Sequence, residues 1–248
     1  MEFGIFDHIL AFFILIIFPV LSAQSGKPDK DVIKMLPPKK HLYYTNGLLL
    51  IIAAMLVCTA WNIGNRSWVQ FGFSKPHFNI TVWVSISVIV IVYIADIIMT
   101  FVKKDTSKDA FNDLTYVIPV QWNEFKPYIF LALSAGICEE IIYRGFLIHY
   151  LIYLGGENAS SQVFALLIPA IVFGISHRYQ GWWAVIKIFL IAIILGIIYV
   201  SSASLLIVIL IHVLIDLISG WVGIIYFKTN TISEDEKHSY SDEIINKT

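Results

Sequence analysis

The chain has 248 residues, of which 58% are hydrophobic and 14% are charged, and its formal net charge is −1. An average soluble domain is roughly 45–50% apolar and about 25% charged, so this composition is typical of a membrane protein instead. The small net charge gives no attraction for nucleic acid, and two cysteines do not make a disulfide framework.

Seven apolar segments have about the length of a membrane-spanning helix, which needs roughly 20 residues. They cover residues 5–21, 43–61, 80–102, 127–152, 163–177, 183–200 and 204–227. This pattern predicts an all-α fold, a polytopic transmembrane helical bundle of about seven spans. The number becomes eight if residues 204–227, or the stretch before Pro127, are divided.

The first segment ends at residues 21–24 in a sequence that resembles a signal-peptidase site. The residues before it contain Glu2 and Asp7 but no Lys or Arg. Because a signal peptide begins with a basic region, we expect the segment to be a retained first span.

Basic residues alternate between successive loops. The loop at 22–42 has five, 103–126 has four, 178–187 has two and the tail has three, against two in all other loops together. The positive-inside rule then predicts a multi-pass protein of the cell membrane, with its N-terminus outside and its C-terminus in the cytoplasm.

The chain divides into three parts by this reading. Residues 1–126 hold spans and loops without a recognisable motif, 127–227 form the core that carries the polar residues, and 228–248 form a polar cytoplasmic tail. The stretch Phe111–Tyr128 mixes polar and apolar residues, and we expect it to lie at the membrane interface.

Ionisable residues are present inside the later spans. A charged side chain at mid-bilayer costs at least about 2.5–3.5 kcal/mol, and such residues usually face a protein interior or a water-filled cavity. The residues concerned are Glu139, Glu140 and Arg144 in the fourth span, His177 at the end of the fifth, and His212 and Asp216 in the last.

Helix geometry separates the two glutamates. At 100° per residue, Glu140 and Arg144 lie about 40° apart and can form an ion pair across one turn. Glu139 is turned about 100° from Glu140, so it needs another environment such as water, a histidine or a metal.

Three helices can bring Glu139, His177 and His212 to one cavity, with Asp216 near His212. A glutamate beside histidines suits general-base activation of water. The same four residues also suit a divalent metal such as Zn, whose usual ligands are imidazole and carboxylate. Hydrolysis is the reaction class for either arrangement, and a purely structural role remains the alternative for each residue taken singly.

At these residues the sequence resembles the CPBP family of intramembrane proteases, also called the Abi family. It includes the CAAX prenyl endopeptidases and bacterial enzymes of bacteriocin processing. The family motif EExxxR is present as residues 139–144, FxxxH as Phe173 to His177, and HxxxN or HxxxD as His212 to Asp216. The resemblance covers about residues 125–220.

The resemblance implies hydrolysis of a peptide bond in a membrane-associated protein or peptide. Glu139 and His177 would activate the attacking water, and His212 with Asp216 would stabilise the oxyanion. Glu140, Arg144 and Phe173 would support the site. Family members are described both as metalloproteases and as metal-free, glutamate-dependent enzymes.

One position departs from the CAAX-processing relatives, which typically have Asn where this chain has Asp216. An ionised Asp cannot donate a hydrogen bond to an oxyanion. Asp216 therefore suits a metal ligand or a group that orients His212, and the substitution favours a bacterial-type substrate over a prenylated tail.

Two other functions fit the same architecture. A non-catalytic immunity or scaffold protein would keep the fold and tolerate the loss of Glu139. A transporter would also use buried Glu and His, although the chain has no paired halves with broken helices in corresponding positions. Asp96, His149 and Lys187 are expected to be structural or interfacial.

Overall fold

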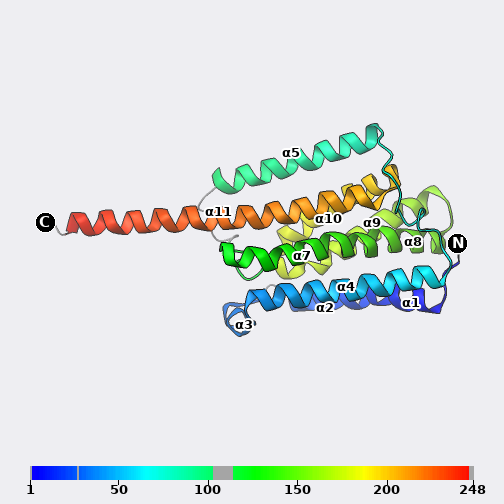
Figure 1. Ribbon diagram of the computed structural model, residues 1–248, viewed down its shortest axis with the longest axis horizontal. Coiled ribbons are helices and arrows are strands. Elements are labelled where there is room, and N and C mark those ends of the chain that lie inside the picture. Colours follow the sequence, from blue (N-terminus) through cyan, green and yellow to red (C-terminus); the bar gives the residue numbers. More distant parts are fainter. Residues whose placement is uncertain (1, 27, 103–113, 246–248) are drawn as a thin grey trace.

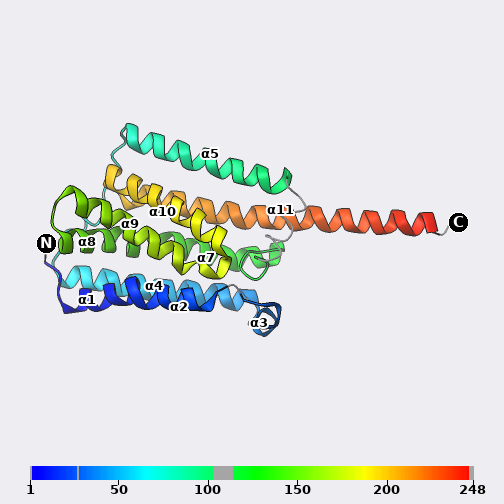
Figure 2. The same cartoon turned by 180° about the vertical axis from the view of Figure 1, so that it is seen from behind.

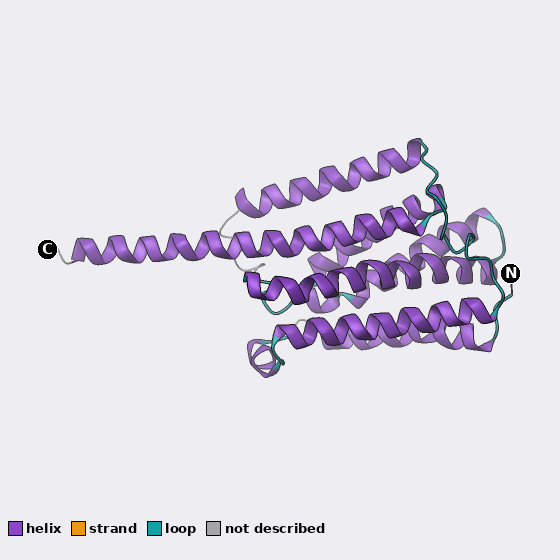
Figure 3. Ribbon diagram, in the orientation of Figure 1, coloured by secondary structure: helices purple, strands orange, loops and turns teal. Residues whose placement is uncertain are grey.

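The computed structural model describes residues 2–26, 28–102 and 114–245, and the elements drawn over these residues are helices (Figure 3). The predicted all-α class is confirmed. In chain order the helices are α1 (Ile5–Phe12), the π-helical turn η1 (Phe13–Ile17), α2 (Phe18–Ser25), α3 (Lys30–Met35), α4 (Lys39–Ile63), α5 (Ile80–Val102), α7 (Trp122–Glu140), the π-helical turn η2 (Ile141–Leu147), α8 (Ile148–Gly155), α9 (Ala159–Ser176), the 3-10 turn η3 (Arg178–Gln180), α10 (Trp182–Ser202) and α11 (Leu205–Ile245).

Within the described residues, six helical segments are long and apolar enough to cross a membrane. Helices satisfy their backbone hydrogen bonds internally, which a bilayer requires of any spanning segment. The six are Ile5–Gln24, Lys39–Ile63, Ile80–Val102, Ala159–Ser176, Trp182–Ser202 and Leu205–Thr229. They correspond to six of the seven predicted spans.

The seventh predicted span is the continuous helix α7–η2–α8. It runs through the bundle beside α4 and α11 (Figure 1), but α7 alone contains four charged residues. It is therefore the polar helix of the bundle, and the side chains of its last two residues, Glu139 and Glu140, are only 14% and 0% exposed.

Two polar parts of the chain extend helices beyond the predicted spans. The last candidate span ends at Thr229, and α11 continues from it without a break through the predicted polar tail to Ile245, projecting beyond the bundle (Figures 1 and 2). The expected interfacial stretch 111–128 lies partly outside the described residues, and its last part, from Trp122, forms the first turns of α7. Apolar segments in the sequence show where a span lies, but they do not show how far its helix continues into the polar residues on either side.

The first span is packed into the bundle by a buried ion pair. Asp7 in α1 accepts a hydrogen bond from Arg66, with 2.7 Å between Oδ1 and Nη2, and both side chains are buried. The Arg66 guanidinium also lies 4.4 Å from the ring centre of Phe3. Arg66 lies in the loop after α4, and its side chain reaches back to Asp7 of α1 and to the end of α4.

The remaining helices surround the polar helix. Seen from behind, α9 lies between α2 and α10 and packs against both (Figure 2). Helix α5 is the most exposed, and its buried residues Val82, Ser85 and Ile89 are all in its first half. The second half is held by polar contacts, including an ion pair of 2.7 Å between Asp96 and Lys187 of α10. The candidate catalytic residues lie at another place in the bundle, where α7, η2, α9 and α11 meet.

Candidate active site

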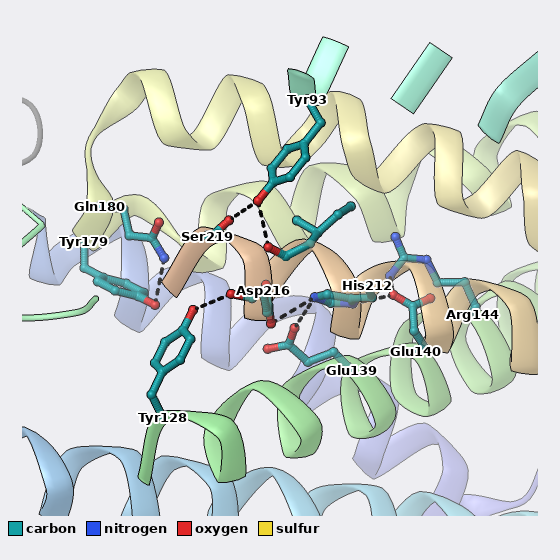
Figure 4. Close-up of polar contacts among 11 residues, drawn as sticks. Tyr93, Tyr128, Glu139, Glu140, Arg144, Tyr179, Gln180, His212, Asp216 and Ser219 are labelled. Carbon is teal, nitrogen blue, oxygen red and sulfur yellow. Dashed lines mark hydrogen bonds and ion pairs between the residues drawn. The ribbon is translucent and has the colours of Figure 1, made fainter. Parts of the chain in front are cut away.

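The predicted site residues come from three helices that pass close to one another. Glu139 and Glu140 are the last two residues of α7, and Arg144 follows in η2. His212 and Asp216 lie one turn apart in α11 and point towards them (Figure 4). The close-up shows this set as one continuous group of polar contacts.

Glu140 is the centre of the buried half of this group. Its side chain is 0% exposed, and its Oε1 lies 2.7 Å from Arg144 Nη1 and 2.7 Å from His212 Nδ1. Arg144 also donates from Nη2 to the carbonyl of Ala192 in α10 at 3.0 Å. The predicted pair of Glu140 and Arg144 is therefore present, and it extends to a third residue, His212.

The second oxygen of Glu140, Oε2, is buried and has no hydrogen-bond partner among the described residues. Both donors converge on Oε1 alone. A buried charge that loses its partner is strongly destabilising, so this carboxylate depends on Arg144 and His212 together.

Glu139 faces the other nitrogen of the same histidine. Its Oε2 lies 3.6 Å from His212 Nε2, and Asp216 Oδ2 lies 3.8 Å from that atom. These distances are those of ion pairs and are too long for hydrogen bonds. The side chains of Glu139 and Asp216 are 14% and 29% exposed, whereas that of Glu140 is fully buried. The half of the site that contains Glu139 is therefore the accessible one.

His177 is placed beside the group by the ring of Phe173. The ring centres of Phe173 and His177 are 4.7 Å apart, those of Phe173 and His212 are 6.1 Å apart, and the Arg144 guanidinium lies 5.4 Å from the Phe173 ring. The structure thus brings Phe173, His177 and His212 together, but no contact between His177 and Glu139 is recorded among the described residues.

The tautomer of His177 follows from its one hydrogen bond. Nδ1 lies 2.8 Å from the carbonyl oxygen of Phe173. A carbonyl can only accept, so Nδ1 carries the proton and Nε2 of the neutral ring has a free lone pair.

A glycine allows α7 and α11 to approach at the site. A Cβ on Gly136 would lie 2.5 Å from Val213 Cγ2 and 2.9 Å from the backbone nitrogen of Val213. Small residues at helix contacts permit such close packing in membranes. Gly136 is one turn before Glu139 and Glu140, and Val213 follows His212, so this contact determines how near the carboxylates and the imidazole lie.

Three tyrosines near the site have no counterpart in the predicted set. Tyr128 of α7 donates to the backbone carbonyl of Asp216 at 3.0 Å, and Tyr93 of α5 lies 2.9 Å from the carbonyl of Ile215 and 2.7 Å from Ser219 Oγ. These contacts hold adjacent carbonyls of α11 from two sides (Figure 4). Lone tyrosines in apolar segments carry no sequence signal for such a role.

The third is Tyr179, in the turn between α9 and α10. Its hydroxyl accepts a hydrogen bond from Gln180 Nε2 at 3.0 Å. Burial raises the pKa of Tyr179 to about 12, and the charges of Glu139 and Asp216 add to the rise. Its hydroxyl therefore keeps its proton at neutral pH and can donate at the open end of the site.

A catalytic zinc site would need three of the candidate ligands to face one point. Among the described residues no three His, Cys, Asp or Glu side chains are grouped so that they could hold a metal ion. His212 Nδ1 is already bonded to Glu140, which leaves one imidazole nitrogen free. As they lie, Glu139, His177, His212 and Asp216 do not form the three-ligand set that catalytic zinc sites use.

Part of the chain matches a known protein family. Residues 121–218 match the family model described as type II CAAX prenyl endopeptidase, Rce1-like. This agrees with the predicted resemblance to the CPBP family, and the matched segment contains all of the predicted site residues. No curated protein and no solved structure matches the chain. The matched model describes endopeptidases, and the six apolar helices are those expected of a multi-pass membrane protein.

Proposed function

We propose that this chain is an intramembrane endopeptidase that hydrolyses a peptide bond of a membrane-associated protein or peptide by means of a water molecule activated by Glu139. One observation carries the proposal. Glu140 binds Nδ1 of His212, and the opposite nitrogen of that ring therefore faces the carboxylate of Glu139 at 3.6 Å. Addition of water to a carbonyl needs a base for the water and a donor for the oxyanion. The carboxylate of Glu139 and the fixed imidazole of His212 face each other and can supply these two functions.

The reaction begins with water between Glu139 and the scissile carbonyl. Glu139 takes one proton from the water as its oxygen attacks the carbonyl carbon, and the carbonyl double bond opens to an oxyanion. Glu139 then returns the proton to the leaving nitrogen as the peptide bond breaks. His177 supports the first step, because the lone pair on its Nε2 can accept a hydrogen bond from the same water.

His212 is the donor proposed for the oxyanion. As an imidazolium it donates from Nδ1 to Glu140 and from Nε2 to the oxyanion. An ionised Asp216 cannot donate, and its carboxylate, 3.8 Å from Nε2, instead balances the charge of the imidazolium. Glu140, Arg144 and Phe173 hold the ring in place.

We propose no step through a metal, because the described residues hold no group of three His, Cys, Asp or Glu side chains placed to bind one ion. A divalent ion such as zinc would supply a Lewis acid at the carbonyl. Here His212 and the water held by Glu139 supply the equivalent functions.

The proposed orientation places the C-terminus in the cytoplasm and the N-terminus outside the cell membrane. The basic loops before α4 and before α10 lie at the same end of the bundle as the projecting part of α11 (Figure 1). This distribution supports the positive-inside assignment. A reporter fused after Thr248 that is active only in the cytoplasm tests it.

The function is tested by comparing wild type with Glu139→Gln and His177→Ala. Membranes containing each protein are analysed by labelling of new peptide N-termini, and purified proteins are incubated in liposomes with quenched fluorescent membrane peptides, farnesylated and unmodified. We expect cleavage to fall by about 10²–10⁴-fold in Glu139→Gln, the range for loss of a general base.

Glu157→Gln is the matched control, because Glu157 is exposed in the loop before α9. Equal thermal stability and equal membrane insertion of all variants exclude unfolding as the cause. Undiminished cleavage by Glu139→Gln would contradict the assignment and would favour a non-catalytic scaffold.

A further inference from the structure

An apolar groove follows the contact of α4 with α7 on the outer surface of the bundle. Its volume is about 380 Å³, and its walls include Ile51, Met55 and Cys58 from α4 and Phe130, Leu133 and Ile137 from α7. Ser134 also lines it, but its hydroxyl donates to the carbonyl of Phe130 at 2.8 Å. The groove therefore offers shape and apolar contact rather than hydrogen bonds.

The groove is separate from the candidate active site. Phe130 and Glu139 are nine residues apart, which places them about 180° apart around α7. The groove faces α4 and the surrounding lipid, whereas Glu139 faces α11. What binds in the groove consequently does not occupy the position of a scissile bond.

Two lysines lie beyond one end of the groove: Lys126 is one turn before Phe130 on α7, and Lys40 is about three turns before Ile51 on α4. Lys40 precedes Tyr44 by four residues on α4, and the ring of Tyr44 packs against that of Phe130 with 5.4 Å between centres. Residues four apart share a helix face, so both lysines continue the lines of residues that form the groove.

These two lysines differ from their neighbour Lys39. Lys39 forms an ion pair with Glu124 at 2.7 Å, with both side chains largely buried. Lys40 and Lys126 are exposed, and the described residues give neither of them an ion pair. An apolar groove that ends in unpaired positive charge matches a molecule with an acyl chain and an anionic head.

We propose that the α4–α7 groove binds an anionic phospholipid of the surrounding bilayer. One acyl chain lies along Phe130, Leu133 and Ile137, and the phosphate group lies between Lys40 and Lys126. Basic pockets between transmembrane helices are known to select anionic head groups over neutral ones. The bound lipid fastens α4 to α7, the helix that carries Glu139 and Glu140.

The test measures binding and stability rather than proteolysis, so it is independent of the proposed enzymatic function. The purified full chain in neutral detergent is titrated with phosphatidylglycerol or with phosphatidylcholine of the same acyl chains. The melting temperature and the mass of the retained lipid adduct are recorded. We expect phosphatidylglycerol to raise the melting temperature by several degrees more than phosphatidylcholine does, because a ligand that binds only the folded state stabilises it.

Variants then distinguish the lysines from the apolar groove in the proposed lipid site. In Lys40→Gln/Lys126→Gln the preference for phosphatidylglycerol should disappear while both lipids still bind weakly. In Leu133→Trp the groove is filled, and the response to both lipids should be lost. The controls are Lys34→Gln, an exposed lysine of α3 paired with Asp31, and Leu190→Trp, an exposed position on α10. Both controls should respond as wild type does.

Two results would overturn the proposal. One is an equal response of the wild-type protein to the two lipids. The other is full retention of the phosphatidylglycerol preference in the double lysine variant, which would place the anionic lipid elsewhere on the surface.

Discussion

Glu140 and His212 are joined by a hydrogen bond of 2.7 Å between Oε1 and Nδ1, across the contact of α7 with α11. The same oxygen accepts from Arg144. Glu140 therefore does two things at once: it neutralises a buried guanidinium, and it orients the imidazole that faces Glu139. The sequence motif suggests only the first of these.

Glu140→Gln should destabilise the protein by about 3–5 kcal/mol, the usual cost of leaving a buried charge without its partner. The amide keeps the shape of the side chain but leaves Arg144 uncompensated. The free energy of unfolding in mixed micelles measures the effect. Asp96→Asn is the comparison, because the side chains of Asp96 and its partner Lys187 are about half exposed, and we expect a loss of no more than about 1 kcal/mol there. Equal losses in the two variants would show that Glu140 is not in a buried, charge-dependent position.

Tyr128→Phe should lower the turnover number more than it changes KM. It removes a hydrogen bond of 3.0 Å to the carbonyl of Asp216, worth about 0.5–1.5 kcal/mol, while the packed ring remains. The turn of α11 that bears Asp216 then loses one of its two tyrosine contacts.

Tyr93→Phe and the double variant complete a cycle for this pair. If both tyrosines hold the same turn, the combined loss will differ from the sum of the single losses. Tyr153→Phe, at a position 42% exposed, is the control. Strict additivity in the cycle would mean that the two hydroxyls act independently.

Gly136→Ala should reduce activity by moving α7 away from α11. The new Cβ would meet backbone as well as side-chain atoms of Val213, which cannot move aside without the helix. Overpacking of this kind typically costs about 1–3 kcal/mol.

Gly196→Ala in α10 is the matched control, because its Cβ would meet only the end of the flexible Leu166 side chain. Cleavage rates and melting temperatures of both variants are compared with those of the wild type. Wild-type activity in Gly136→Ala would show that the separation of the carboxylates from His212 is not limiting.

Chelation should leave proteolysis unchanged if the reaction proceeds as proposed. The protein is dialysed against EDTA or 1,10-phenanthroline, its metal content is measured, and cleavage of the reporter peptide is followed before and after addition of zinc. Loss of activity on chelation with recovery on addition of zinc would contradict the metal-free mechanism and would require Glu139, His212 and Asp216 to rearrange into a ligand set.

The sequence predicts the helices well because a span must be about 20 apolar residues long and must satisfy its backbone hydrogen bonds internally. Predicted spans at 80–102 and 183–200 differ from α5 and α10 by at most two residues at any end. The end of α11 was not predictable in the same way, since nothing in a polar sequence forces a helix to stop at the membrane surface.

Within the site, the sequence predicts contacts between residues of the same helix but not contacts between helices. The pairing of Glu140 with Arg144 follows from their spacing, and the shared face of Phe173 and His177 does too. The bond between Glu140 and His212 depends on how α7 lies against α11, which is determined by the contact at Gly136. Spacing within α11 favours Asp216 as the partner of His212, whereas the hydrogen bond is made by a residue of another helix.

The π-helical turn η2 affects where the continuous helix α7–η2–α8 can gain or lose a residue. A π-helical turn accommodates one residue more than an α-helical turn, so the helix could lose one residue between Ile141 and Leu147 and continue unbroken with both ends facing as they do now. A deletion within α7 has no wide turn to absorb it and would rotate the carboxylates by about 100° relative to the rest of that helix. Insertions and deletions among homologous chains should therefore be found in η2 and not in α7.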